Sequence, residues 1–286
     1  MNNMKKIGLS ALAGSLVAFS ANAVEVSVSG KTEVTYSGVE GTNGNKWGGG
    51  NAITFSGSGD VNGMTATYTA VIGDSGQASS NTSETFASSS LMLDMGDMGT
   101  VGFDQGVGEF GVSTIDDKMP YAYEEIWTYT GASNGLRAAG GTNVLGYKNT
   151  FAGYTLSVEL DPGHSDSATS TKGGSGDGYN TGADTTQSGY NWALTGSPMD
   201  GVSVGIGAGK EENQIATLDD ESYSTGFVTY AMGGLTVGYQ MSENNGGTAG
   251  ETNNNVEIYG ASFGINENLS VSLNQMDTEF DKASGT

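Results

Sequence analysis

Residues 223–242 read YSTGFVTYAMGGLTVGYQMS, and the spacing in this stretch recurs along the chain. After the pair Gly233-Gly234, apolar side chains occupy every second position and alternate with small or polar ones, the apolar ones being Leu235, Val237, Tyr239 and Met241. Strict alternation of this kind is typical of a half-buried β-strand. Because a Gly-Gly pair suits a tight turn, residues 222–231 and 234–242 are predicted to form an antiparallel hairpin.

The same period of two appears in most of the chain after Val24. In 154–160, for example, Tyr, Leu, Val and Leu alternate with Thr, Ser and Glu. No amphipathic helix competes with this pattern, although 105–142 has room for a turn or two of helix. The alternation predicts thirteen antiparallel strands, over 24–37, 49–59, 63–72, 86–95, 99–104, 143–150, 154–161, 187–196, 201–209, 222–231, 234–242, 255–264 and 269–277.

The connections between the predicted strands alternate between short and long. The tight ones are 60–63, 96–99, 151–153, 197–201, 232–234 and 265–268. The long ones are 38–48, 73–85, 105–142, 162–186, 210–221 and 243–254. This alternation places all tight turns at one end of the sheet and all long loops at the other.

A soluble β-sandwich gives no reason for such asymmetry, because both of its ends face water. Outer-membrane barrels have short periplasmic turns and longer extracellular loops. Since every backbone polar group in hydrocarbon must be paired, such a sheet has to close. We therefore expect an all-β chain that forms a transmembrane antiparallel β-barrel, with its apolar face toward lipid and its polar face toward the lumen.

Aromatic residues and leucines lie close to the predicted tight turns. In a barrel they would form a girdle at the membrane boundary. They would also fit an ordinary strand, because aromatics favour strands in general. The residues concerned are Phe151, Tyr154, Trp192, Phe227, Tyr230, Leu235, Phe263 and Leu269.

Composition and charge exclude several classes of protein. The chain has 286 residues with 48 glycines and 3 prolines, but 13 tyrosines and 9 phenylalanines argue against disorder. Ten basic residues against 32 acidic ones give a net charge of −22, which would repel nucleic acid. With no cysteine and one histidine, thiol nucleophiles, cysteine-based zinc sites and iron–sulfur clusters are impossible.

Residues 1–23 have the pattern of a secretory signal peptide. Lys5 and Lys6 precede an apolar stretch, 7–19, and Ala21-Asn22-Ala23 is a small-x-small cleavage site. The apolar stretch is too short to cross about 30 Å of hydrocarbon comfortably. The sequence therefore predicts export, with a single barrel domain over 24–286.

At this point the sequence resembles the general bacterial outer-membrane porins, most closely the alphaproteobacterial type. The resemblance rests on the signal ending at Ala23, the opening strand 24–38, hairpins such as 232–239, and the long third loop after 99–103. It implies a sixteen-stranded homotrimer in the outer membrane, a third loop folded into the pore, and passive diffusion of small hydrophilic solutes.

The end of the sequence departs from that family. Porins normally close with a strand that ends in an aromatic residue, whereas 281–286 is polar and loop-like. Thirteen is also an odd number, and bacterial single-chain barrels have even numbers of strands. We expect a C-terminally incomplete chain that lacks its last strands. A smaller barrel, with the strand count wrong by one, stays open.

The resemblance implies that loop 105–142 narrows the channel. A ring of carboxylates in a constriction favours cations, and the candidates at the base of the loop and within it are Asp104, Glu109, Asp116, Asp117, Glu124 and Glu125. On the wall that follows, Arg137 and Lys148 would face these acids and create a transverse field. Alternatively, the acids form an ordinary solvated loop surface.

The remaining motifs do not indicate a specific chemical function. The glycine-rich run 172–178 resembles one turn of a calcium-binding repeat, but such repeats need several tandem copies. His164 lies between aspartates in a serine-rich loop without a nucleophile elbow, so we expect no enzyme activity. No cofactor or resident metal is expected, although acidic loops can bind divalent cations loosely.

The function predicted from the sequence is passive diffusion of ions and small hydrophilic solutes across the outer membrane, with a weak preference for cations. Lipid, lipopolysaccharide and two further copies of the chain are the expected partners. One alternative is a substrate-specific channel or a loop-based surface receptor. The other is a secreted structural or adhesin β-protein, which would not need the alternation of short turns and long loops.

Overall fold

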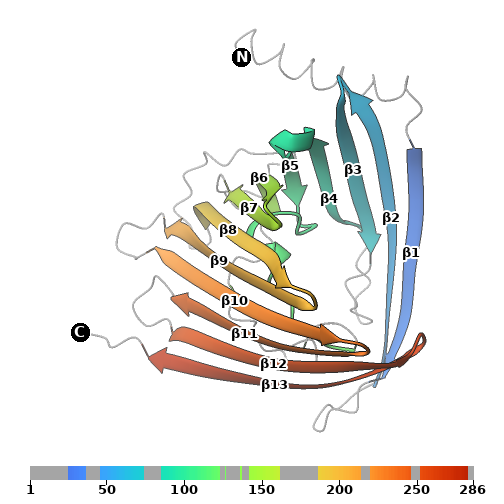
Figure 1. Cartoon of the computed structure of the whole chain (residues 1–286). Helices are drawn as coiled ribbons and strands as arrows, with labels where there is room; N and C mark the ends of the chain where they lie inside the picture. The colour runs from blue at the N-terminus through green and yellow to red at the C-terminus, as the bar shows by residue number, and fades with distance from the viewer. Residues whose placement is uncertain are drawn as a thin grey trace. The chain divides into compact units, whose positions relative to one another are not determined.

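A computed structural model of the chain describes residues 25–36, 46–73, 85–122, 126, 136, 142–161, 186–213, 220–245 and 252–282. Within these ranges the chain forms thirteen β-strands and two short 3-10 helices (Figure 1). No helix in the described part of the chain is long and apolar enough to cross a membrane. The elements are β1 (Glu25–Tyr36), β2 (Trp47–Val61), β3 (Met64–Gly73), β4 (Thr85–Asp94), η1 (Gly96–Met98), β5 (Thr100–Gln105), η2 (Gly111–Thr114), β6 (Thr142–Phe151), β7 (Tyr154–Asp161), β8 (Thr186–Met199), β9 (Val202–Asn213), β10 (Glu221–Met232), β11 (Leu235–Asn245), β12 (Thr252–Asn266) and β13 (Leu269–Lys282).

The order of the strands in the sheet is their order in the chain, from β1 to β13. Strands β1 to β4 pair antiparallel with their neighbours, and so do β6 to β13. The all-β prediction and the thirteen strands are therefore confirmed. The chain divides into two compact units, residues 1–103 and 104–286, and each is described by itself.

Several predicted strand ends are wrong by three to five residues. Strand β9 continues to Asn213 instead of 209, β11 continues to Asn245 instead of 242, and β12 begins at Thr252 instead of 255. Strand β8 continues to Met199 instead of 196, and its pairing with β9 shifts register between Gly196 and Met199, around Pro198. Proline cannot donate to the ladder and is tolerated at such a bulge. Strand β13 continues to Lys282 instead of 277, because its polar end still pairs with β12 where no hydrophobic alternation signals a strand.

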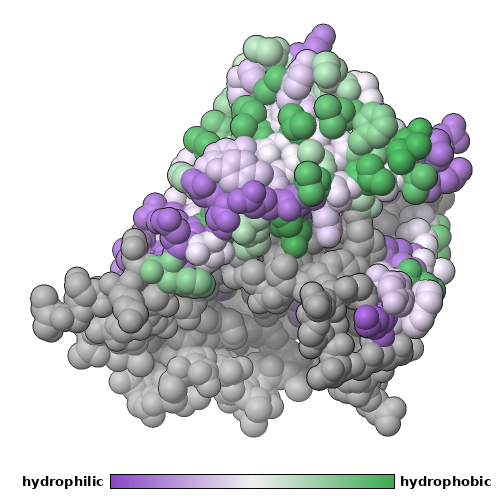
Figure 2. Space-filling model, turned by 90° about the horizontal axis from the view of Figure 1, so that it is seen from below, coloured by the Kyte–Doolittle hydropathy of each residue, from purple (hydrophilic) through white to green (hydrophobic). Residues whose placement is uncertain are grey.

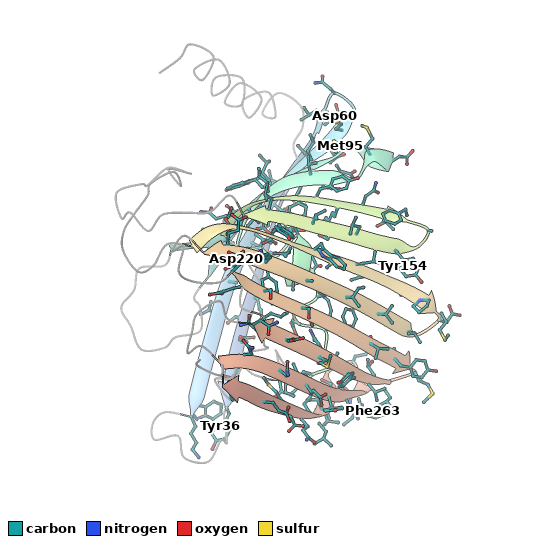
Figure 3. All side chains as sticks on the ribbon, turned by 90° about the vertical axis from the view of Figure 1, so that its left-hand side faces the viewer. Tyr36, Asp60, Met95, Tyr154, Asp220 and Phe263 are labelled. Atoms are coloured by element: carbon teal, nitrogen blue, oxygen red, sulfur yellow. The ribbon has the colours of Figure 1, made fainter. Side chains whose placement is uncertain are left out.

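In unit 1, the connections keep the predicted polarity. Figure 3 places Asp60 and Met95 near the β2–β3 and β4–β5 connections, and Tyr36 at the opposite end of β1. The β2–β3 turn is Asn62-Gly63, where both residues have positive φ (54° and 82°). This is the geometry of a type I′ hairpin turn, which Asn-Gly adopts most readily.

In unit 2, Tyr154 and Phe263 lie at the short-turn end and Asp220 at the end of the long connections (Figure 3). One of the two-residue turns there is Ala152-Gly153, again with two positive φ values (52° and 81°). Glycine adopts this conformation without strain, whereas alanine is strained in it.

The strands of unit 2 have one apolar and one polar face. Cross-strand partners such as Leu156 and Leu194, or Val228 and Tyr239, share the first face. Many of its side chains are exposed, including Ile206 (53%), Val271 (50%) and Leu273 (81%). Figure 2 shows hydrophobic residues, in green, gathered over part of the described surface beside a separate group of hydrophilic ones. An exposed apolar face is what a lipid-facing wall requires, and we call it the outer face.

The opposite, inner face is polar or small and is largely buried. It includes Ser157 and Glu159 on β7, Asn191 on β8, and Gln240 on β11. Phe227 also lies here, 7% exposed, so its predicted place in an aromatic girdle is wrong. The reason is the period of two along β10, which places Phe227 on the face opposite Val228 and Tyr230. Gly205 on β9 leaves the space that the ring fills.

Candidate functional site

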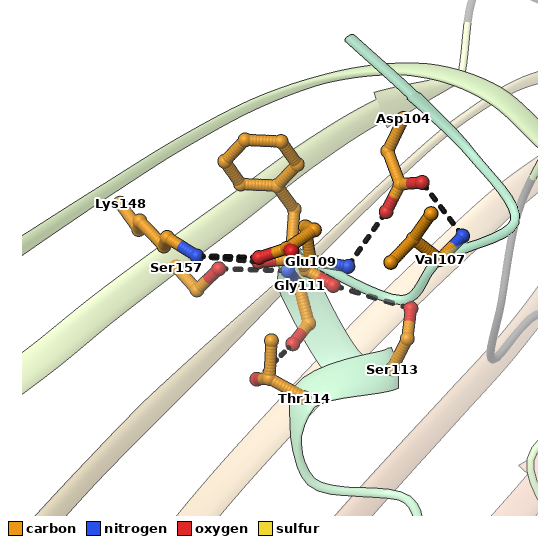
Figure 4. Close-up of polar contacts among 9 residues, drawn as sticks. Asp104, Val107, Glu109, Gly111, Ser113, Thr114, Lys148 and Ser157 are labelled. Atoms are coloured by element: carbon orange, nitrogen blue, oxygen red, sulfur yellow. Dashed lines mark hydrogen bonds and ion pairs between the residues drawn. The ribbon is translucent and has the colours of Figure 1, made fainter. Parts of the chain in front are cut away.

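A buried aspartate shapes the start of the loop that follows β5. Asp104 is 1% exposed. Its Oδ1 accepts the backbone N–H of Val107 at 2.7 Å, and its Oδ2 accepts that of Glu109 at 2.6 Å (Figure 4). Both oxygens are thus used to turn the chain. The carboxylate shapes the loop and presents little of its surface to solvent.

The turn at Asp104 brings an acidic residue of the loop into contact with a basic residue of the sheet. Glu109 Oε2 lies 2.8 Å from Nζ of Lys148 on the inner face of β6. Nζ also lies 3.4 Å from the Glu109 carbonyl oxygen and 5.5 Å from the centre of the Phe110 ring. The Lys148 and Glu109 side chains are each about one-third exposed. The pair is therefore in direct contact, on one side of the lumen-facing surface.

The next turn of the loop, η2, is capped by the wall. Its preceding residue, Phe110, offers no side-chain cap. Ser157 Oγ on β7 accepts the N–H of Gly111 at 2.8 Å, and Asn191 Oδ1 on β8 accepts the N–H of Val112 at 2.8 Å. The start of a helix leaves its first backbone N–H groups without intrahelical partners, and the strands pair two of them here.

A second acid lies beneath η2. Glu159 on β7 is 4% exposed. Its Oε1 accepts a hydrogen bond from Asn191 Nδ2 at 3.1 Å, and its Oε2 accepts one from Ser113 Oγ at 3.4 Å. Asn191 thus binds the loop backbone with its oxygen and the wall acid with its nitrogen.

Beyond η2 the loop packs into an apolar cluster on the inner face. The buried residues of this cluster are Val112, Ile115, Met119, Leu136, Ala193, Tyr223, Phe227, Val256 and Ile258. Gln240 Nε2 on β11 donates to the Ile115 carbonyl at 3.1 Å, and Asn274 Nδ2 on β13 donates to the Pro120 carbonyl at 2.8 Å. Segment 110–120 therefore lies across the inner face from β6 to β13.

Small wall residues make this close approach possible. A Cβ atom at Gly146 would overlap the Phe110 ring, and one at Gly207 would lie 2.9 Å from Ile115 Cδ1. One at Gly238 would lie 2.7 Å from Pro120 Cδ. Such distances are far below van der Waals contact, so the loop depends on glycine at these positions.

The remaining predicted site residues are placed as follows. Asp117 is exposed and Asp116 is half-buried, and both have interaction partners. Lys118, which was not among the predicted site residues, is exposed beside them. Glu124, Glu125 and Arg137 lie outside the described residues.

The side chains that anchor the loop were not predicted from the sequence: Ser157, Asn191, Gln240 and Asn274. Each lies on the polar side of a period-two strand, where many serines, threonines and asparagines look alike. The sequence does not say which of them a loop from far along the chain will reach. The only available signal was glycine at inner positions, which marks a close backbone approach.

Comparisons with known proteins agree with this architecture. The family model of Gram-negative porins matches residues 8–286. The anion-selective porin from Comamonas acidovorans is 17% identical, with a TM-score of 0.57 over 90% of this chain and 80% of that one. Salmonella typhi OmpF, in a complex with daunomycin, is 11% identical, with a TM-score of 0.60 over 90% and 79%. At these identities the likeness establishes the fold alone. No curated protein matches significantly.

Proposed function

The chain belongs to the Gram-negative porin family, and from this we propose that it is a weakly cation-preferring general diffusion pore. Membership implies a channel in the outer membrane rather than an enzyme. The finer proposal is that loop 105–142 forms the constriction and that solutes are filtered by size and charge, without energy coupling.

The observation that carries the proposal is the position of segment 110–120 across the inner face. Side chains of β7, β8, β11 and β13 hydrogen-bond to this segment, and it packs closely against glycines of β6 and β9. The segment therefore occupies lumen cross-section that the strands alone would leave to water. This supports a constriction formed by the loop.

The charges support the cation preference. Glu109 and Lys148 neutralise each other in direct contact. Asp116 and Asp117 follow on the same loop, beside Lys118, in a chain of net charge −22. A negative surface at a narrow point raises the local cation concentration. Glu124, Glu125 and Arg137 belong to the same proposed constriction.

The first experiment is single-channel recording of the full-length protein in a planar bilayer under a salt gradient. We expect ohmic current steps and a reversal potential of the cation-selective sign. Membrane-inserted, folded protein that gives no steps would contradict the channel. Steps with an anion-selective reversal potential would leave the channel standing and overturn the charge assignment.

The remaining proposals concern processing and assembly. We propose that residues 1–23 are removed as a signal peptide, leaving the barrel domain 24–286, and that the protein is a homotrimer beside lipopolysaccharide. Thr32 and Asn51 support a protein contact on the apolar face of β1 and β2, because their hydrogen-bonded side chains (2.8 Å) interrupt an apolar surface. Mass spectrometry of the purified protein checks the start at Val24, and its native mass checks the trimer.

A further inference from the structure

The Lys148 ammonium occupies a small site that the loop builds. A carboxylate oxygen, a carbonyl oxygen and an aromatic ring surround Nζ, at 2.8 Å, 3.4 Å and 5.5 Å. All three belong to Glu109 and Phe110. We propose that these two residues form a binding site for one organic ammonium group and that Lys148 is its built-in occupant. The inference rests on the proposed channel function and names a selectivity-determining residue for it.

The three groups fit an ammonium ion in particular. A carboxylate forms a charge-assisted hydrogen bond with N⁺–H, and a carbonyl oxygen accepts a second one. The face of an aromatic ring attracts a cation through its quadrupole, at up to about 6 Å from the ring centre. An anion finds no donor among them, so the site takes primary ammonium groups.

The site does not depend on the lysine for its shape. Asp104 Oδ2 fixes the Glu109 backbone N–H at 2.6 Å. The Phe110 ring is fully buried and lies over Gly146, where a Cβ atom would overlap it. Lys148 comes from β6, whereas both site residues come from the loop. Shortening Lys148 therefore leaves the carboxylate, the carbonyl and the ring in place.

This arrangement makes Lys148 a tethered counter-ion. While it is bound, the Glu109 charge is cancelled and contributes little to ion selectivity. Both side chains are about one-third exposed, so water and solutes reach them. Removing the ammonium would expose a negative site that small ammonium ions in solution can fill.

The test is chemical rescue of Lys148→Ala in the full-length channel. This substitution removes a fragment equivalent to n-propylammonium and leaves Cβ. We expect the cation-to-anion permeability ratio, measured from reversal potentials, to rise about threefold, because one negative charge that solutes can reach is uncovered. Adding n-propylammonium should return the ratio toward the wild-type value, whereas tetramethylammonium, which lacks N–H donors, should not.

Two further variants isolate the site. Lys210→Ala removes the same charge from the outer face, where Lys210 is paired with Asp220 at 2.6 Å, and should leave the ratio unchanged. Glu109→Gln combined with Lys148→Ala should restore a wild-type ratio that no longer responds to n-propylammonium. If Lys148→Ala does not fold, as judged by heat-modifiable mobility in gels, Lys148→Met should show the same shift without rescue, because its side chain fills the site.

The outcomes separate this inference from the proposed function. If the wild-type protein gave no current steps, the proposed channel function would be wrong. Wild-type current steps together with a Lys148→Ala ratio that n-propylammonium does not change would overturn the ammonium site and leave the channel intact. An equal shift in Lys210→Ala would also overturn it, since the effect would then come from overall charge.

Discussion

Asn191 on β8 accepts the backbone N–H of Val112 at 2.8 Å, although 79 residues separate the two in the chain. The wall thus supplies the cap that the loop's own sequence lacks at Phe110. Because the same side chain also donates to the buried Glu159, it couples the loop to the wall through one amide group.

Asn191→Leu should therefore release the loop. It removes the acceptor of the Val112 N–H and one of the two donors to the Glu159 carboxylate, and a buried polar group left unpaired costs about 1–3 kcal/mol. We expect a lower temperature of denaturation, and larger, noisier single-channel currents. The matched control is Asn149→Leu on the outer face of β6. If both variants give wild-type currents, Asn191 does not hold the constriction.

Gly146→Ala tests the packing of the Phe110 ring against β6. The added Cβ overlaps the ring, so Phe110 has to move, and overpacking of this kind typically costs about 1–3 kcal/mol. We expect a changed conductance together with a lower stability in thermal denaturation. Gly226→Ala on β10 is the control, because its Cβ would lie 3.6 Å from Ile206 Cγ2, an ordinary contact. Equal effects of the two substitutions would contradict the role of Gly146.

The strands and their connections could be predicted from the sequence because both depend on local patterns. Leu235 to Met241 alternate with small or polar residues, and turn glycines such as Gly153 and Gly233 mark the hairpins. Several strand ends could not be predicted, among them those of β8 and β13. Pro198 and the polar residues after 277 contradict the local strand signal, and only pairing with the neighbouring strand extends these elements.

The candidate site was predictable only in part. Glu109 and Lys148 could be proposed from charge and loop length, and the structure brings them together at 2.8 Å. Asp104 was proposed for the same reason, yet its carboxylate is buried by two backbone N–H groups that no sequence pattern announces. The contact of Asn191 with Val112 depends on where the loop falls in space, which charge and periodicity do not specify.

The two I′ turns make a prediction about stability. Ala152 has φ = 52° in the β6–β7 turn, and Asn62 has φ = 54° in the β2–β3 turn. Asparagine tolerates this conformation better than alanine does, by about 1 kcal/mol. Ala152→Asn should therefore raise the thermal stability and Asn62→Ala should lower it, both without effect on conductance. Shifts of the same sign would show that the turn conformations are not what limits stability.

Asp116 and Asp117 carry the proposed cation preference, and their neutralisation tests it. Asp116→Asn with Asp117→Asn removes two negative charges from the loop. We expect the cation-to-anion permeability ratio to fall at least about twofold, because each charge near the ion path attracts cations and repels anions. The effect should weaken in concentrated salt, where the Debye length is short.

The control removes the same charge from a different place. Asp277 and Glu279 lie exposed on the outer face of β13, so Asp277→Asn with Glu279→Gln also removes two negative charges. If position in the lumen matters, only the loop variant changes the reversal potential. If both variants change it equally, the preference arises from the net charge of the protein, and the constriction is not the selectivity filter. Because the two variants have equal net charge, their difference measures location alone.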